Sequence, residues 1–180
     1  MEINEYKEWI ESFTFESIID RTKKRKGKSQ EYFTPTELVQ EMLDKMELSK
    51  PDLFIDENKT LIDNAAGDGQ FLTQIVIRKM ERSGCTLEQA LSTTYGVELM
   101  EDNVKLCKKK LAGPKLTQEI LNILDKNIVC HDALTYDYSF GELAYVGRDF
   151  FKIVLPIENL LPKDVYFLYY PNEGEQQTRV

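Results

Sequence analysis

The feature that most constrains the fold of this chain is the alternation, in its middle, of short apolar runs with longer stretches of helical periodicity. The short runs have strand character and occur at residues 60–63, 94–98 and 127–130. Between them, apolar residues recur at spacings that place them on one face of a helix. Repeated strand-helix units of this kind predict an α/β protein with a doubly wound parallel sheet.

Two helices are predicted before the first strand. The first is an N-terminal extension whose apolar residues, between residues 3 and 13, fall on one face. In the second, Thr34 is expected to cap the helix, Pro35 to take its first position and Glu37 to complete a capping box. Both helices are expected to pack on the main core.

Small and polar residues predict where the later helices begin and end. Gly84 is expected to end the helix that follows the first strand, because glycine is favoured just past a helix. Thr86 is expected to cap the next helix, with Gln89 as its capping-box partner. After the second strand, one helix is expected to end at Gly113 and a further helical stretch to cover residues 116–124.

The pattern weakens beyond Asp132. Residues 136–148 have no clear period and are interpreted as a loop. Two further strands are predicted at residues 150–155 and 165–170, and the polar tail at residues 172–180 is expected to be mobile.

Length and composition favour one globular domain. With 180 residues, of which 42% are hydrophobic, the chain can bury one core but is too short for two ordinary domains. We expect a helix and basic loop at residues 1–30, the main domain at residues 31–171 and the tail at residues 172–180. The absence of a long apolar run and of a signal-peptide pattern predicts a cytoplasmic protein without a membrane span.

Charge limits how the chain could bind nucleic acid. The formal net charge of -8 opposes binding of a polyanion by the whole surface. One basic run has two open interpretations, a local phosphate contact or a solvated loop. A second run, at residues 108–110, is interpreted as the solvated end of a helix. The residues of the first run are Arg21, Lys23, Lys24, Arg25, Lys26 and Lys28.

The expected strand ends carry residues suited to a nucleoside. In a doubly wound sheet, ligands bind at the carboxyl ends of the strands, where a glycine turn lets the backbone approach them. Gly67 and Gly69 follow the first strand, although glycines also serve such turns for purely structural reasons. Glu98 ends the second strand, where a carboxylate can accept both hydroxyls of a ribose. Asp132 follows the third strand, where it can accept from an adenine amino group.

A nicotinamide dinucleotide is the main competing ligand, and the spacing argues against it. The dinucleotide fingerprint needs a third glycine, where this chain has Leu72, and an acidic residue closer than Glu98. Asp63 and Asp68 would also repel a pyrophosphate. S-adenosylmethionine, which carries sulfonium and ammonium charges and no phosphate, fits these residues better.

Four motifs resemble those of the amino-group adenine DNA methyltransferases. Residues 63–72, Asp-Asn-Ala-Ala-Gly-Asp-Gly-Gln-Phe-Leu, resemble the Asp-Pro-Ala-Cys-Gly-Ser-Gly-x-Phe-Leu motif of that family, with Asn64 and Asp68 as departures. Residues 32–35, Tyr-Phe-Thr-Pro, resemble its Phe/Tyr-Phe-Thr-Pro box. Residues 96–99 and 131–134 resemble its next two motifs. The order is most similar to that of modification subunits of type I restriction systems, over about residues 30–135.

The resemblance implies an S-adenosylmethionine site. The Tyr-Phe-Thr-Pro box would frame the methionine end of the cofactor, above the residues of the glycine turn. Glu98 would bind the ribose hydroxyls, Leu99 would pack on the adenine ring and Asp132 would accept from its amino group. The cofactor-binding residues implied in this way are Tyr32, Phe33, Thr34, Pro35, Asp63, Ala65, Gly67, Gly69, Phe71, Glu98, Leu99, Asp132 and Ala133.

The motif that holds the target adenine is missing from this sequence. Family members use Asn/Asp-Pro-Pro-Tyr/Phe after the fourth strand, where polar atoms accept from the amino group and the ring stacks on the flipped base. Here residues 156–159 are Pro-Ile-Glu-Asn, and the tetrad occurs nowhere in the chain. No catalytic residue is therefore assigned. The sheet is expected to be Rossmann-like but truncated in its C-terminal half, with an exposed edge that favours a protein partner or a homo-oligomer.

These expectations leave more than one function open. The chain could be an adenine methyltransferase whose base pocket is completed by a partner. It could instead be a catalytically inactive, cofactor-binding accessory or interfering subunit that acts through protein partners. A small-molecule methyltransferase is a third possibility, which the Tyr-Phe-Thr-Pro box disfavours by resemblance.

Overall fold

The computed structural model describes residues 1–13, 34–138, 140 and 151–152. Helices and strands alternate in this part of the chain, as the periodicity predicts. Their order is α1 (Ile3–Glu11), α3 (Thr36–Ser49), β1 (Leu61–Asp63), α4 (Gln70–Ser83), α5 (Leu87–Ser92), β2 (Thr94–Glu98), α6 (Glu101–Ala112), α7 (Gln118–Asn127), β3 (Ile128–Cys130) and β4 (Phe151–Lys152).

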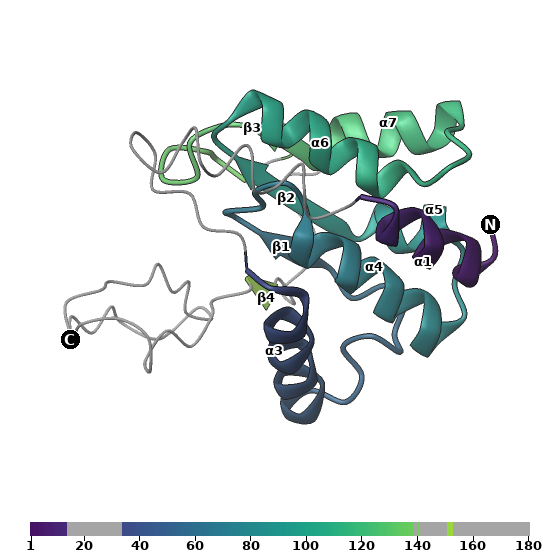
Figure 1. The fold of residues 1–180 in the computed structure, drawn as a ribbon. Coiled ribbons are helices and arrows are strands. Elements are labelled where there is room, and N and C mark those ends of the chain that lie inside the picture. The colour runs from purple at the N-terminus through teal and green to yellow at the C-terminus, as the bar shows by residue number, and fades with distance from the viewer. Residues whose placement is uncertain (14–33, 139, 141–150, 153–180) are drawn as a thin grey trace, which may run out of the picture.

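The strands form one parallel sheet in the order β3-β2-β1-β4 (Figure 1). Asp63 pairs with Gly96 and Glu98 with Cys130, so the carboxyl ends of β1, β2 and β3 lie at one edge. This confirms the predicted α/β class and the first three predicted strands. β4 lies within the predicted strand at residues 150–155. The strand predicted at residues 165–170 and the tail lie outside the described residues.

The two faces of the sheet are covered differently. Alternate residues of a strand point to opposite faces. Leu61 and Ile128 belong to a large core to which every helix of the described residues contributes. On the opposite face, Ile62, Tyr95 and Val97 pack against Phe140 and the non-helical segment after β3. Within the described residues, helices therefore cover one face and an aromatic loop covers the other.

Most predicted helix boundaries are confirmed. Gly84 ends α4 in the left-handed conformation, with φ 72°. Thr86 and Gln89 form both hydrogen bonds of the predicted capping box at the start of α5. Gly113 ends α6 with φ 71°.

Two predicted helix starts are wrong. Thr34 does not cap α3, because Pro35 is extended at the N-cap position and α3 begins at Thr36 without a side-chain cap. The helical stretch predicted from Leu116 begins only at Gln118. There the hydroxyl of Thr117 accepts from the backbone N–H of Ile120 at 3.1 Å, which leaves Leu116 exposed outside the helix. In the first case the backbone restriction at proline overrides the predicted cap, and in the second the cap at Thr117 overrides the apolar pattern.

Helix α1 packs on the core and on the end of α6, as the apolar face predicts. Tyr6 is fully buried, and its hydroxyl donates to the backbone carbonyl of Leu111 at 3.4 Å. The indole Nε1 of Trp9 donates to the carbonyl of Lys110 at 2.9 Å. No helix in the described part of the chain is long and apolar enough to cross a membrane.

The amino edge of the sheet, by which we mean the end where the strands begin, holds a buried amine. Lys79, in α4, is 1% exposed, and its Nζ lies 3.0 Å from the carbonyl oxygen of Lys59 and 2.9 Å from that of Thr93. The hydroxyls of Thr93 and Thr94 complete its surroundings, at 2.7 and 3.3 Å. Burial lowers the pKa of Lys79 to about 7. Its ammonium is thus held by neutral oxygen atoms at the end of the sheet opposite the glycine turn.

Candidate functional site

Backbone hydrogen bonds join the three strand ends into one surface. The N–H of Ala66, in the turn after β1, donates to the carbonyl of Val97 at 3.1 Å. The N–H of His131, after β3, donates to the carbonyl of Glu98 at 2.9 Å. Both flanking segments are therefore attached to β2. The structure brings together the predicted residues at the ends of β1, β2 and β3.

The glycine turn packs closely on its surroundings. Gly67 and Gly69 have φ angles of 54° and 88°, which favour glycine. The N–H of Gly67 donates to Glu98 Oε2 at 2.8 Å, and that of Gly69 donates to the carbonyl of Ala66 at 2.8 Å. A Cβ atom on Gly69 would lie 2.8 Å from Cys107 Sγ of α6. Glycine at residue 69 is thus required by backbone conformation and by close packing.

Glu98 is held in place by the backbone around it. Its Oε1 accepts from the N–H of Met100 at 2.9 Å and from Asn103 Nδ2 at 3.4 Å, while Oε2 accepts from Gly67. The side chain is almost fully buried. A carboxylate offers about four acceptor positions. Three donors leave capacity for a further donor, such as a hydroxyl.

Asp63 lies partly buried at the end of β1. Its Oδ1 accepts from the N–H of Ala65 at 3.0 Å. Burial raises the pKa of Asp63 to about 6, the Ala65 N–H lowers this pKa, and the neighbouring Glu98 raises it. A positive charge placed beside Asp63 would favour its ionised form. The local electrostatics therefore suit a cationic ligand.

Beyond β2 and β3, a polar and an apolar side chain face solvent. Leu99 is 64% exposed, and Asp132 is exposed with its Oδ1 accepting from the N–H of Leu134 at 2.9 Å. Ala133 is partly buried, and its carbonyl accepts from the hydroxyl of Tyr138 at 2.8 Å. The exposed leucine is suited to pack on the face of a heteroaromatic ring, and the exposed carboxylate is suited to accept a hydrogen bond from an amino group of that ring.

The loop after β3 is held by aromatic packing. The Tyr136 ring lies 5.3 Å from that of Tyr138 and 5.1 Å from that of Phe140. The Tyr136 hydroxyl also accepts from the N–H of Phe140 at 3.0 Å. These contacts show that Tyr136 and Tyr138 pack within the loop.

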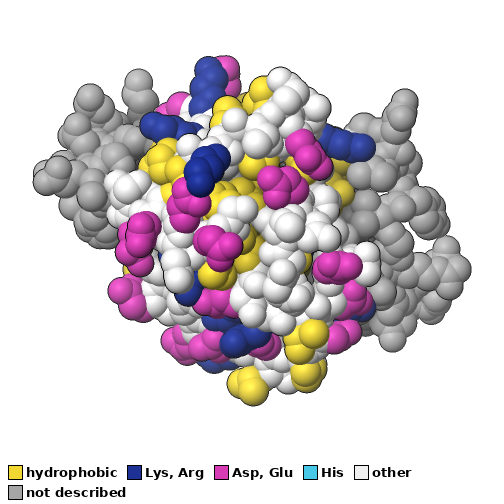
Figure 2. Space-filling model, turned by 90° about the vertical axis from the view of Figure 1, so that its right-hand side faces the viewer, with side chains coloured by type: hydrophobic (Ala, Val, Ile, Leu, Met, Phe, Trp, Pro, Cys, Tyr) yellow, Lys and Arg dark blue, Asp and Glu magenta, His cyan; other side chains and the backbone are white. Residues whose placement is uncertain are grey.

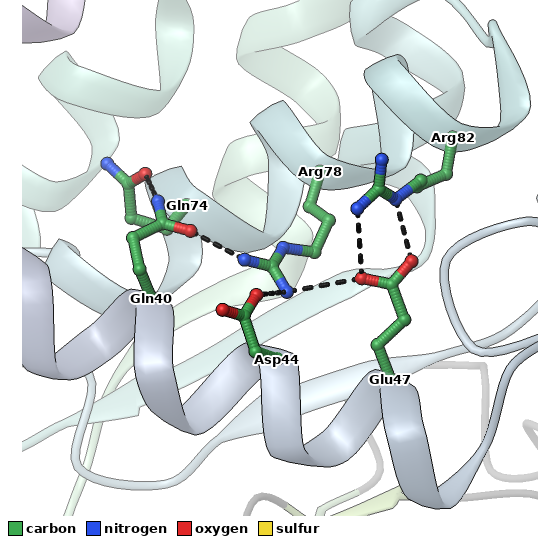
Figure 3. A network of polar contacts seen from close by, with 6 residues as sticks. All are labelled: Gln40, Asp44, Glu47, Gln74, Arg78 and Arg82. Atoms are coloured by element: carbon green, nitrogen blue, oxygen red, sulfur yellow. Dashed lines mark hydrogen bonds and ion pairs between the residues drawn. The ribbon is translucent and has the colours of Figure 1, made fainter.

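A series of polar contacts aligns α3 with α4 (Figure 3). Gln70 Nε2 donates to Thr36 Oγ1 at 2.6 Å, and one turn further along Gln40 contacts Gln74. Both pairs are separated by 34 residues. The two helices therefore run parallel, with their N-termini at the same end.

Buried Arg78 completes this alignment. Its guanidinium lies 2.7 Å from Asp44, 3.2 Å from Glu47 and 2.6 Å from the side-chain oxygen of Gln40. Arg82 extends the contacts to the end of the helices, 2.6 Å from Glu47.

This alignment places the start of α3 beside the glycine turn. Thr34 and Pro35 immediately precede α3, so the structure brings this half of the Tyr-Phe-Thr-Pro box close to the start of α4. Tyr32 and Phe33 lie outside the described residues. Phe71, the other predicted residue of α4, is buried and packs in the large hydrophobic core just after the glycine turn.

The burial of Lys110 was not predicted from the sequence. The interpretation of residues 108–110 as a solvated helix end is wrong for this residue, whose Nζ lies 2.8 Å from Asp68 Oδ2 in a fully buried ion pair. Lys110 comes three residues after buried Cys107 and one before Leu111, so it lies on the inward face of α6. That spacing is the pattern that could have indicated its burial. Lys108 is partly exposed and pairs with Asp125 at 2.9 Å.

The described residues contain neither a metal-binding cluster nor a disulfide bond. Among them, no group of three or more His, Cys, Asp or Glu side chains could hold a metal ion. Cys85, Cys107 and Cys130 are free. On the side of the molecule shown in Figure 2, acidic side chains are widely spread and basic ones are interspersed among them.

A parallel sheet with a glycine turn and carboxylates at its strand ends is the arrangement by which many α/β proteins bind nucleosides and nucleotides. Sequence comparison gives the family within that class: the profile of the N-6 DNA methylase family matches residues 11–140. The match covers well over half of the chain, which therefore belongs to this family and is a DNA methyltransferase-like protein. No curated protein and no solved structure matches the chain.

Proposed function

We propose that this chain binds S-adenosylmethionine at the carboxyl edge of a Rossmann-like sheet. The strand order β3-β2-β1-β4 supports this fold, because it is the order of the first four strands of the doubly wound dinucleotide-binding sheet. The carrying observation is the position of Asp63 and Glu98 on either side of the glycine turn, without a phosphate-binding cation among the predicted site residues. This surface suits a cationic nucleoside better than a phosphorylated one.

Each predicted residue has a role that its surroundings permit. Glu98 would accept from a ribose hydroxyl with its remaining acceptor capacity. Exposed Leu99 would pack on the adenine ring, and Asp132 would accept from the adenine amino group beside Ala133. The methionine part would lie over Asp63 and the glycine turn, framed by the Tyr-Phe-Thr-Pro box. Bound S-adenosylmethionine would supply an electrophilic methyl group.

The proposed acceptor is the amino group of adenine in DNA, following the family. Because the sequence lacks the Asn/Asp-Pro-Pro-Tyr/Phe tetrad, we propose that a partner completes the base pocket. The alternative is an inactive accessory or interfering subunit, which the same missing tetrad favours. A role in restriction-modification, a cytoplasmic location and a protein partner or homo-oligomer belong to this proposal.

Calorimetric titration with S-adenosylmethionine tests the cofactor site. We expect Glu98→Gln to weaken binding about 10- to 100-fold, because a hydrogen bond to a charged group is lost and an amide N–H would face the Gly67 N–H. Glu101→Gln is the matched control, since Glu101 is exposed at the start of α6. Absence of binding by the unaltered protein would refute the proposal.

A radiolabelled methyl-transfer assay on mixed-sequence DNA separates the two functions. The partner hypothesis predicts incorporation only when host extract is added, and the accessory hypothesis predicts none in either case. Incorporation by the purified chain alone would show that these residues complete their own base pocket.

DNA retention tests the basic run, which lies outside the described residues. If the run contacts phosphate, neutralising Lys23, Lys24, Arg25 and Lys26 should reduce retention and its salt dependence. Unchanged retention would favour the solvated loop.

A further inference from the structure

The glycine turn contains a buried charge that the family motif does not have. Asp68 is 1% exposed and stands where the resembling motif has serine. Its Oδ2 lies 2.8 Å from Lys110 Nζ, whereas its Oδ1 has no hydrogen-bond partner among the residues that the structure describes. Removing two charges from water costs several kcal/mol per ion before their attraction repays it. Stability alone is therefore a poor explanation for this pair.

The pair joins the turn to a different part of the molecule. Gly67 and Gly69 are hydrogen-bonded to Glu98 and to the turn itself, on the side of β2. Lys110 reaches the same turn from the last turn of α6, which packs behind it. The Asp68 side chain is thus held from a second direction, by a bond between groups 42 residues apart.

The backbone of Lys110 is held by the N-terminal helix. Trp9 donates to its carbonyl at 2.9 Å, and Tyr6 donates to the next carbonyl, that of Leu111, at 3.4 Å. A Cβ atom on Gly113 would lie 2.6 Å from Met1, so α1 packs tightly against this end of α6. A continuous series of contacts therefore runs from α1 through Lys110 to Asp68.

We propose that Lys110 is a positioning residue for the cofactor turn and that it couples helix α1 to S-adenosylmethionine affinity. This inference rests on the proposed function. Lys110 neutralises Asp68 and fixes the turn in the conformation that presents the Gly67 N–H to Glu98. Without Lys110, the buried carboxylate of Asp68 has lost its ion pair and should move toward water, and this movement would displace the two glycines beside it.

The affinity test compares Lys110→Met with the double variant Asp68→Ser/Lys110→Met. Lys110→Met should weaken S-adenosylmethionine binding about 10- to 100-fold, because the buried carboxylate of Asp68 loses its ion pair and no longer holds the turn in place. The double variant should bind within about 3-fold of the unaltered protein, since it buries no unpaired charge and a serine hydroxyl can bond to the backbone of the turn. Lys108→Met, on the same helix, is the control and should change nothing.

Trp9 provides a spectroscopic readout of the coupling, because it is the only tryptophan in the chain. Its emission should change when S-adenosylmethionine binds to the unaltered protein and to the Lys108→Met variant. The change should be lost in Lys110→Met at a cofactor concentration that saturates it. An equal change in Lys110→Met would contradict the coupling.

Hydrogen exchange without cofactor separates failure of this inference from failure of the proposed function. The amides of Gly67 and Gly69 should exchange at least about 10-fold faster in Lys110→Met than in Lys108→Met. If the unaltered protein binds no S-adenosylmethionine but exchange accelerates, the positioning role stands and the cofactor assignment is wrong. Unchanged exchange and unchanged affinity would overturn the inference, as would equally weak binding by the single and double variants.

Discussion

The two edges of the sheet bury opposite charges in different ways. At the amino edge, the amine of Lys79 is surrounded by oxygen atoms that satisfy all of its donors. At the carboxyl edge, Asp63 and Glu98 flank the glycine turn and Leu99 faces solvent. One oxygen of Asp68 accepts no hydrogen bond from the described part of the chain. The comparison teaches that burial of charge does not by itself identify a binding site. The proposed site rests instead on unused acceptor capacity next to exposed side chains.

The two edges should also respond to pH in opposite directions. Asp63 has a raised pKa, so between pH 4 and 6 the folded state binds more protons than the unfolded state and stability falls as pH rises. Lys79 has a lowered pKa, so above pH 7 the unfolded state binds more protons and stability rises. This rise is expected up to about pH 9, above which buried Cys107 and Tyr6, whose pKa values are raised by burial, oppose it.

The largest expected effect is at the amino edge. Lys79→Met should lower the free energy of unfolding by about 3 kcal/mol, because the carbonyls of Lys59 and Thr93 lose their buried donor. It should also abolish the rise in stability between pH 7 and 9. Urea denaturation measures both, with exposed Arg82→Met on the same helix as control. Cofactor affinity of the folded variant should not change, and a loss of affinity would break the distinction between the edges.

A smaller effect, of opposite sign, is expected at the carboxyl edge. Asp63→Asn keeps the hydrogen bond from Ala65 but removes the titrating charge, so the variant should be more stable above pH 6. The gain is on the order of 2 kcal/mol, somewhat less than the full linkage energy of a pKa raised from 3.8 to about 6, because Asp63 is partly exposed to solvent. Exposed Asp125→Asn should stay within about 0.5 kcal/mol of the unaltered protein. Urea denaturation between pH 4 and 8 checks this, and a destabilised Asp63→Asn protein would contradict it.

Cofactor titration of Asp63→Asn completes the comparison. If this edge is a binding site, the stabilised variant should bind S-adenosylmethionine more weakly, because its cationic groups lose a carboxylate. If Asp63→Asn is more stable than the unaltered protein but binds S-adenosylmethionine equally tightly, Asp63 has no part in the site.

The smallest expected effect concerns the contact between α3 and the glycine turn. Gln70→Ala removes the hydrogen bond to Thr36 and should weaken S-adenosylmethionine binding about 5-fold, the equivalent of roughly 1 kcal/mol. Calorimetry measures it, and Gln118→Ala, which removes an exposed contact with Asn122, is the control. Identical affinities for the two variants would show that the box does not need this contact.

The sequence predicts elements whose determinants are local. The strands and the capping box at Thr86 follow from apolar runs and from a single pair of side chains. The strand ends at Glu98 and Asp132 follow from the rule that parallel strands share a carboxyl edge. The resemblance to the methyltransferases, which the family match confirms, depends on the same short motifs.

The parts that could not be predicted depend on tertiary contacts between residues far apart in the chain. Lys79 and Lys110 have side chains that favour solvent, and the packing of α4 and α6 shows what their buried amines contact, which spacing along one helix does not reveal. The contact between Thr36 and Gln70 needs the register of two helices, which neither helix encodes alone. The side chains that set the electrostatics of the site are therefore less predictable than the motifs around them.

The parallel alignment of α3 and α4 has a consequence for insertions and deletions. One added residue between Gln40 and Asp44 would rotate the rest of α3 by about 100°, because an α-helix has about 3.6 residues per turn. The side chains facing Arg78 would then point elsewhere, and the start of α3 could not stay beside the glycine turn while its other end stayed docked. The same insertion in the connection at residues 55–59 would leave the facing side chains of α3 and α4 aligned. Length variation is therefore compatible with this site between the two helices, but not within them.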